Sequence, residues 1–386
     1  MSGSRQADLK PQGSNEVTAS RLMSLDVFRG VTIAAMLLVN DPGDEQTVFW
    51  PLRHAAWNGW TPTDLIFPFF LFIVGVSMAF SIATRLRRNA SRTAAFRHVL
   101  WRGLILFAIG LLLNGAVVKF HVTTWRVYGV LQRIAIVYVI CAILALWFGR
   151  RVWVAKVIGY LVVYWILLRY VPVPGYGVPT HEIPLLDPER NLAAWLDRKV
   201  LAGHLLAGTY DPEGLLSTIP ALATTLLGLL TGDWLRSEHT SRVKAAAMAL
   251  AGMACVALGE FFNIWFPVNK TLWTSSYVVL SGGLALLVLA LCYVVLDVRQ
   301  WRGRWPAPFL VFGMNAIAAY VLGSVLAIVL YLAPVGDRSA QEFLYQELFA
   351  PLAEPFTASL LYAVSFVLAC WAGMWVLYRK RIFVKI

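Results

Sequence analysis

Charged residues are scarce in this chain. Asp, Glu, Lys and Arg together make up 14% of its 386 residues, whereas a soluble protein carries roughly 25%. Hydrophobic residues make up 59%, and the mean hydropathy is +0.66. Because so few charges cannot cover the surface of a soluble protein of this length, most of the chain must face lipid or other apolar helices. The composition therefore predicts an all-α, polytopic transmembrane helix bundle.

The motifs of several enzyme classes are absent as well. The sequence has no G-x-x-x-x-G-K-[ST], no H-E-x-x-H, no G-x-S-x-G and no Cys/His cluster, so ATP hydrolysis and zinc chemistry have little support. Its four cysteines lie inside apolar runs without C-x-x-C spacing, which is typical of small side chains buried in a membrane. We therefore expect no metal site.

About ten apolar stretches approach the roughly 20 residues that a membrane-spanning helix needs: 25–41, 62–84, 99–118, 128–148, 152–171, 215–235, 243–262, 276–297, 307–333 and 356–378. The loops between them alternate in charge, since loop 84–98 is basic without any acid whereas loops 41–61 and 334–355 are net acidic. The positive-inside rule then predicts that both termini are cytoplasmic. The net charge of +12 lies in such short basic clusters, so it indicates contact with the lipid bilayer and not with nucleic acid.

No repeat or linker divides the chain into several domains. Residues 1–23 are polar and lack an apolar signal region, so we expect a cytoplasmic tail there and a single transmembrane domain over 24–386. The longest outer loop, 172–214, has five prolines in its first half, which exclude a continuous helix there. Because loops of that length are usually functional, we expect 172–214 to form a periplasmic cap over the outer opening.

A histidine and a carboxylate stand at the outer mouth of the second apolar stretch. His54 lies in a short polar loop, and Asp64 follows ten residues later at the first turn of the helix. An imidazole beside a carboxylate is suited to proton transfer. Alternatively, His54 merely lies at the membrane interface and Asp64 merely caps a helix. Asn40, at the outer end of the first stretch, is close to His54 in sequence.

Two arginines enter the fourth apolar stretch. Arg126 and Arg133 are seven residues apart, which places them on one helix face about two turns from each other. Charges at membrane depth are functional candidates, and two cations on one face could line a path for an anion. The structural alternative is that both arginines pair with carboxylates such as Asp64 or Glu260.

Three further polar residues lie within or beside apolar stretches. Gln132 is next to Arg133, Lys270 stands at the outer entry of the eighth stretch, and Asn315 lies inside the ninth. A buried Asn often joins helices by hydrogen bonds, although it could also reach a ligand.

These residue types are compatible with two functions. A neutral imidazole can take a proton from an attacking amine, or can itself attack an activated acyl group. Intramembrane arginines suit the phosphates of an anionic cofactor. Acyl transfer across the membrane fits this set, and so does an inner-membrane amino-sugar transporter in which His and Asp relay protons.

The chain resembles the heparan-α-glucosaminide N-acetyltransferase family in five segments that occur in the same order: SLDVFRGVTIAAMLLVN (24–40), HAAWNGWTPTDLIFPFFLFIVGVS (54–77), RVYGVLQRIAIVY (126–138), DPEGLLSTIPALATTLLG (211–228) and PVNKTLWTSSYV (267–278). The similarity is closest to the short bacterial members. It therefore implies a multi-pass protein of the bacterial inner membrane, and a homodimer is compatible with it. Lysosomal members carry a large lumenal N-terminal region, so a small periplasmic amino sugar or a cell-wall glycan terminus is the expected acceptor here.

The resemblance implies that acetyl-CoA supplied from the cytoplasm acetylates an amino sugar or glucosaminide on the opposite side. It implies that His54 is the active-site histidine, acting as a general base or as a transient acyl acceptor. Asn40 is then expected near the acetyl group, with Asp64 as a helix cap or a partner of the histidine. We expect acetyl-CoA to contact five other polar side chains: Arg126, Gln132, Arg133, Lys270 and Asn315.

Overall fold

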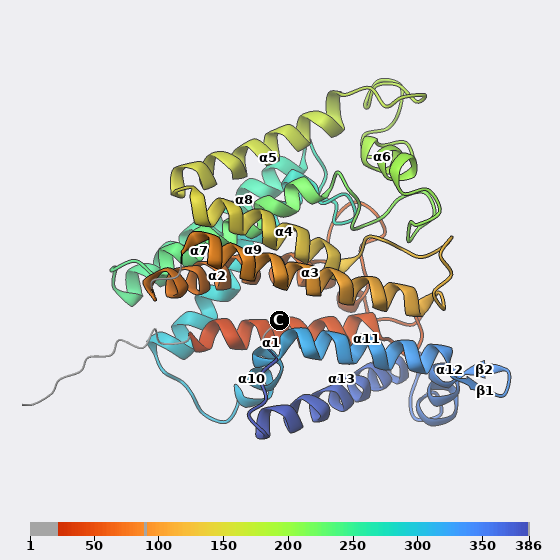
Figure 1. Ribbon diagram of the computed structural model, residues 1–386. Coiled ribbons are helices and arrows are strands. Elements are labelled where there is room, and N and C mark those ends of the chain that lie inside the picture. Colours follow the sequence, from red (N-terminus) through yellow and green to blue (C-terminus); the bar gives the residue numbers. More distant parts are fainter. Residues whose placement is uncertain (1–21, 89–90, 385–386) are drawn as a thin grey trace, which may run out of the picture.

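The computed structural model describes residues 22–88 and 91–384 of the protein. Most of the described residues fold into helices (Figure 1), which are α1 (Met23–Asn40), α2 (Ile66–Arg87), α3 (Arg92–Val117), α4 (Val130–Trp147), α5 (Arg150–Tyr170), α6 (Leu192–Val200), α7 (Thr218–Leu235), α8 (Ser241–Asn263), α9 (Ser275–Tyr293), α10 (Ala307–Met314), α11 (Ala316–Leu332), α12 (Ala340–Leu344) and α13 (Pro355–Arg379). Short 3-10 turns span Trp50–Leu52 and Pro62–Leu65, and π-helical turns span Val294–Val298 and Tyr345–Phe349. Two two-residue strands, β1 (Pro334–Val335) and β2 (Arg338–Ser339), form an antiparallel hairpin. The all-α prediction is confirmed.

Each of the ten predicted apolar stretches is helical. Among the described residues, eight helices are long and apolar enough to cross a membrane, and the bent pair α10 and α11 would make nine. Helix α7 is helical as predicted, but it is not among those eight. The stretch 307–333 is not the single straight helix that the sequence predicted, because α10 and α11 meet at an angle of 85°. The predicted tail, 1–23, lies almost entirely outside the described residues.

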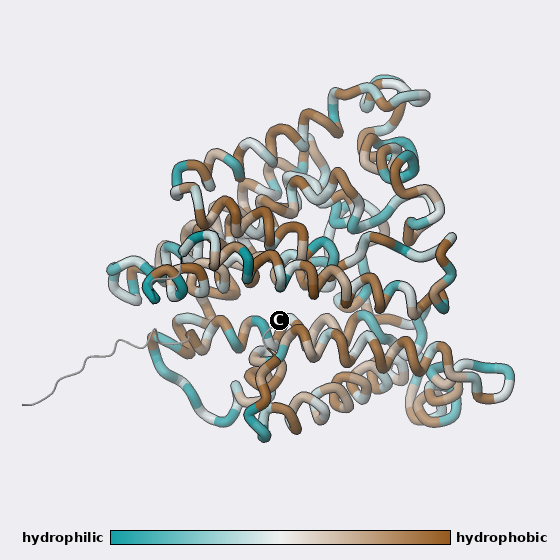
Figure 2. The backbone as a smooth tube through the Cα atoms, viewed as in Figure 1, coloured by the Kyte–Doolittle hydropathy of each residue, from teal (hydrophilic) through white to brown (hydrophobic). Residues whose placement is uncertain are grey.

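The helices form two groups that pack side by side. Helices α1, α10, α11 and α13 contact one another and lie together at the bottom of Figure 1, while α2 to α5 and α7 to α9 lie above them. The helices are apolar along their length and the connecting segments at both ends are more polar (Figure 2). The hairpin and α6 lie at one end of the bundle, and the N-terminal end of α1 lies at the other (Figure 1). We call these the outer and the inner end.

The backbones of α2 and α7 approach each other closely. Among α2 to α5 and α7 to α9, only the pair α8 and α9 packs more extensively than α2 and α7. A Cβ atom added at Gly75 would lie 2.0 Å from the carbonyl oxygen of Thr225, and one added at Gly228 would lie 2.0 Å from that of Phe72. Only glycine fits at either position without displacing the opposite backbone. The contact holds α2, which begins two residues after Asp64, in the core.

The segment 172–214 lies at the outer end and docks on the bundle. It has no helix before α6, as its prolines predicted. The side chain of Asn191 caps α6 by accepting a hydrogen bond from the backbone N–H of Ala194. Trp57, from the loop that carries His54, donates its indole N–H to the carbonyl oxygen of Leu186 at 2.8 Å. This bond fixes the segment beside the predicted reaction centre.

Candidate active site

Asp64 anchors the loop that carries His54. Its Oδ2 accepts hydrogen bonds from the backbone N–H groups of Thr61 and Ala55, both at 3.0 Å, and Thr61 caps the 3-10 turn in a capping box with Asp64. Its other oxygen, Oδ1, lies 2.7 Å from Nδ1 of His54. Asp64 therefore serves both as a cap and as the partner of His54, the two roles that the sequence left open.

The two members of this pair differ in exposure. The Asp64 side chain is 1% exposed, whereas that of His54 is 50% exposed. A carboxylate accepts hydrogen bonds, so Nδ1 of the imidazole carries a proton and its N–H donates a hydrogen bond to Asp64. The unprotonated ring nitrogen is then Nε2, and the exposed His54 side chain makes it accessible. This tautomer can accept a proton from a reactant.

Lys270 belongs to the same group of side chains. Its ammonium nitrogen lies 3.0 Å from Nδ1 and 3.3 Å from Nε2 of His54, and 3.6 Å from Oδ1 of Asp64. Burial lowers the pKa of Lys270, and the neighbouring carboxylates of Asp64 and Glu213 oppose that shift. The sequence suggested Lys270 as a contact for acetyl-CoA, and the structure brings it into contact with the histidine.

The loop of Lys270 is clamped to the loop of His54. The amide of Asn269 donates to Oδ1 of Asn58 at 3.2 Å, and the backbone N–H of Gly59 donates to the carbonyl oxygen of Val268 at 2.7 Å. Asn269 also accepts from the backbone N–H of Leu272 at 2.9 Å. These bonds fix the position of Lys270 relative to His54.

Arg126 precedes α4 and Arg133 lies within it, so the two do not share one helix face as the sequence predicted, but both hold the end of the outer segment. Arg126 donates to Asp211 from Nε at 2.8 Å and from a terminal nitrogen at 2.6 Å, and it also pairs with Glu213. Arg133 is fully buried, donates to the carbonyl oxygen of Gly214 and to Ser217, and lies over the ring of Trp273. The partners of Arg126 are thus carboxylates of the outer segment, and neither Asp64 nor Glu260 is among its bonded partners.

The three remaining predicted residues lie on α4, at the end of α1 and at the break between α10 and α11. Gln132 is buried between α4 and α3, against Gly110. Asn40 is the exposed last residue of α1, a helix that contacts the 3-10 turn of Asp64. Asn315 lies at the break between α10 and α11 with 1% exposure. Among the described residues, no hydrogen bond joins any of these three side chains to His54.

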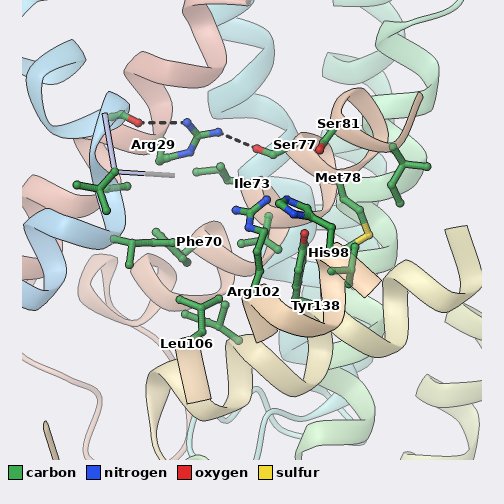
Figure 3. Close-up of a pocket in the computed structure, with 18 of the residues that line it drawn as sticks. Arg29, Phe70, Ile73, Ser77, Met78, Ser81, His98, Arg102, Leu106 and Tyr138 are labelled. Carbon is green, nitrogen blue, oxygen red and sulfur yellow. Dashed lines mark hydrogen bonds between the residues drawn. The ribbon is translucent and has the colours of Figure 1, made fainter. Parts of the chain in front are cut away.

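A cavity of about 470 Å³ opens toward the inner end of the bundle. Four basic side chains line it together with apolar side chains of α2 to α4, α10 and α11: Arg29, Arg85, His98 and Arg102. Figure 3 shows His98 and Arg102 pointing into this space beside Tyr138, with Arg29 across from them. Arg29 donates to Ser77 at 2.7 Å and to the carbonyl oxygen of Gly313 at 3.1 Å. Arg29 also pairs with Asp26 at 3.0 Å, so its position in the cavity wall is fixed.

The cavity follows α2 toward the histidine. Its lining residues on α2 run from Phe70 to Arg85, which is about 22 Å along a helix. Phe70 is six residues beyond Asp64, or about two turns. The sequence did not predict this cavity, because Arg85 was attributed to a basic loop. One available signal was the spacing of His98 and Arg102, four residues apart on one face of α3.

A family model described as "Heparan-alpha-glucosaminide N-acetyltransferase, catalytic" matches residues 21–265. The chain is also similar to two curated proteins that carry the name heparan-alpha-glucosaminide N-acetyltransferase. It is 29% identical to the protein of Mus musculus over 437 aligned positions, which cover 98% of this chain and 62% of that protein. It is 30% identical to the protein of Homo sapiens over 357 positions, covering 78% of this chain and 52% of that protein. The chain thus spans less than two thirds of the length of these relatives.

Proposed function

The chain belongs to the heparan-alpha-glucosaminide N-acetyltransferase family, and we propose that it transfers an acetyl group from acetyl-CoA to the amino group of an amino sugar on the opposite side of the membrane. The observation that carries the proposal is the arrangement along α2. The His54–Asp64 pair stands at the outer end of this helix, and a basic cavity begins about two turns further on and continues to the inner end.

The inner cavity is the proposed site of acetyl-CoA. Guanidinium groups bind phosphates through paired, charge-assisted hydrogen bonds, and Arg85 and Arg102 offer such groups within the cavity. The apolar lining contributed by Phe70 and Leu106 suits the uncharged pantetheine arm. Acetyl-CoA bound with its phosphates at the inner end would extend its thioester along α2 toward His54. Under the positive-inside rule, the basic inner end faces the cytoplasm, where acetyl-CoA is made.

His54 acts in this proposal as a general base for direct transfer. The amine nitrogen of the acceptor attacks the thioester carbonyl carbon while Nε2 of His54 takes a proton from that nitrogen. The resulting tetrahedral oxyanion collapses, the carbon–sulfur bond breaks, and the imidazolium returns the proton to the thiolate of coenzyme A. Asp64 holds the reactive tautomer and stabilises the imidazolium. The products are an N-acetyl sugar and free coenzyme A.

Lys270 is the proposed electrostatic stabiliser of the oxyanion. Its ammonium lies within 3.3 Å of both ring nitrogens of His54, so it is next to the point at which negative charge develops on the carbonyl oxygen. A preorganised positive charge there lowers the energy of the transition state more than that of the ground state. Lys270 is thus assigned to the reacting atoms and not to the phosphates.

The acceptor reaches His54 from the outer end in this proposal. The segment 172–214 adjoins the histidine loop through the bond between Trp57 and Leu186 and through the ring contact of Trp57 with Tyr210. Aromatic faces and polar edges of this kind suit a sugar. We propose a periplasmic amino sugar as the acceptor and the bacterial inner membrane as the location.

The test is transfer of labelled acetyl by the purified protein. We expect acetyl-CoA and glucosamine to give N-acetylglucosamine, detected by mass spectrometry, and His54→Ala to abolish the product. His121→Ala is the matched control, because His121 is an exposed histidine in another outer loop. Normal turnover by His54→Ala would refute the role of His54, and no transfer by the wild-type protein would refute the acetyltransferase proposal.

A further inference from the structure

The chain reverses direction directly after α13. The backbone N–H of Ile382 donates to the carbonyl oxygen of Leu377 at 2.9 Å, and that of Arg381 donates to Tyr378 at 3.0 Å. This pair of bonds is a Schellman motif, which ends a helix with one residue in the left-handed conformation. Arg381 is that residue, with φ of 56°. The turn directs residues 382–384, which we call the strap, back along the inner end of the bundle.

Asn315 holds the strap by its backbone. The side-chain amide nitrogen donates to the carbonyl oxygen of Ile382 at 3.0 Å, and Oδ1 accepts from the backbone N–H of Val384 at 2.9 Å. Asn315 is 1% exposed and lies where the chain bends by 85° between α10 and α11. Both functional groups of its amide are therefore used by one short segment that lies 67 to 69 residues further along the chain.

The strap forms part of the wall of the inner cavity. Phe383 and Val384 line this cavity, together with Gly313, Met314 and Ala316 on either side of the bend. Asn315 thus sits behind the wall and fixes it, while the basic side chains of α1 to α3 form other parts of the lining (Figure 3). The shape of the cavity at this side depends on the position of the strap.

We propose that Asn315 is a positioning residue for the acyl donor, because it holds residues 382–384 as one wall of the donor cavity. This inference rests on the proposed binding of acetyl-CoA in that cavity. Without the two amide hydrogen bonds, the strap leaves its place and the donor loses a shaped wall. Donor affinity then falls, whereas the chemistry at His54, at the other end of α2, is unchanged once the donor is bound.

The test compares two substitutions of one residue. Arg381→Gly and Arg381→Pro remove the same charge, but glycine adopts the left-handed conformation readily whereas proline is restricted to φ near −65° and lacks the N–H that bonds Tyr378. We expect the dissociation constant for coenzyme A, measured by calorimetry, to rise about tenfold in Arg381→Pro and in Asn315→Leu, which is of the order that two net hydrogen bonds contribute. In Arg381→Gly it should stay within about twofold, and kcat at saturating acetyl-CoA should stay within about twofold in all three variants.

Equal affinities in Arg381→Gly, Arg381→Pro and Asn315→Leu would overturn the inference, and so would a fall in kcat without a change in affinity. A second measurement does not depend on the donor. Ser81 lines the cavity, so the thiol of a Ser81→Cys variant should react faster with a soluble maleimide when Arg381→Pro is added than when Arg381→Gly is added. Equal rates would show that the strap is not a wall of the cavity. If the wild-type protein binds no coenzyme A, the proposed function fails, while the maleimide rates still decide whether the strap closes the cavity.

Discussion

Asp64→Asn separates the two tasks of this carboxylate. Oδ2 of Asp64 accepts both backbone N–H groups of the histidine loop, and Oδ1 faces Nδ1 of His54. An asparagine can keep its oxygen on the two backbone donors only by turning its NH₂ group toward His54. That group then donates to Nδ1, so the imidazole carries its own proton on Nε2 and cannot accept one from the acceptor amine. The loop stays folded and the base is lost.

The size of the effect follows from that loss. General-base catalysis contributes about 10²–10⁴-fold, so kcat should fall by that factor, equivalent to about 3–5 kcal/mol in the barrier. Because both backbone hydrogen bonds persist, the free energy of unfolding should change by only about 1 kcal/mol. The assay is acetyl transfer to glucosamine, with thermal unfolding in detergent as the measure of folding.

Asp44→Asn is the matched control for Asp64→Asn. Asp44 lies in the same outer loop, where its carboxylate accepts from the backbone N–H of Gln46 and from Thr47, and its substitution should leave kcat unchanged. A folded Asp64→Asn protein that retains more than about a tenth of the wild-type kcat would refute the tautomer argument. An equal loss in Asp44→Asn would attribute the effect to the net charge of the loop.

Three further predictions concern other charged groups. Burial lowers the pKa of Lys270 below its ordinary value of 10.5, so the transfer rate should fall as pH rises through that lowered pKa. Lys270→Arg should remove this alkaline fall from the pH–rate profile, because a guanidinium stays charged. An unchanged alkaline fall in Lys270→Arg would contradict the role of Lys270. Arg85 lines the inner cavity, so Arg85→Gln should raise KM for acetyl-CoA about tenfold. Arg87→Gln, at an exposed position, should leave KM unchanged. Equal KM values in the two variants would exclude Arg85 from the donor site. Burial raises the pKa of Asp197 from 3.8 to about 6, so the Asp197 carboxyl binds a proton more tightly when the outer segment is folded than when it is unfolded. Lowering the pH from 7 to 5 should therefore stabilise the folded outer segment by about 1 kcal/mol. Amide hydrogen exchange over 190–215, corrected for its intrinsic rate, should slow accordingly, and Asp197→Asn should abolish that change.

The His54–Asp64 pair could be predicted from the sequence because both residues belong to one short loop. Ten residues separate them, and a capping position after Thr61 and before an apolar helix is a local signal. The helices could also be predicted from local signals, because the length of an apolar stretch and the charge of a loop each depend on one short segment of the sequence. The bend at Asn315 could not be predicted, because the apolar run continues through it and the residues that bond to Asn315 lie 67 to 69 positions later in the chain.

The partners of the buried arginines could not be predicted because they lie far away in the chain. Arg126 and Arg133 bond to residues 81 to 87 positions later, and only the fold of the outer segment brings those residues back. The inner cavity has the same origin. Arg29, Arg85 and Arg102 come from three helices, and only the packing of these helices brings the three side chains to one cavity.

The most direct test of the central claim is transfer across a sealed membrane. Vesicles containing the protein in one orientation would enclose glucosamine on the side of His54 and receive labelled acetyl-CoA on the side of Arg85 and His98. The proposal predicts labelled N-acetylglucosamine inside the vesicles with the wild-type protein and none with His54→Ala. Product that forms only when donor and acceptor are on the same side, or that forms equally with His54→Ala, would contradict it.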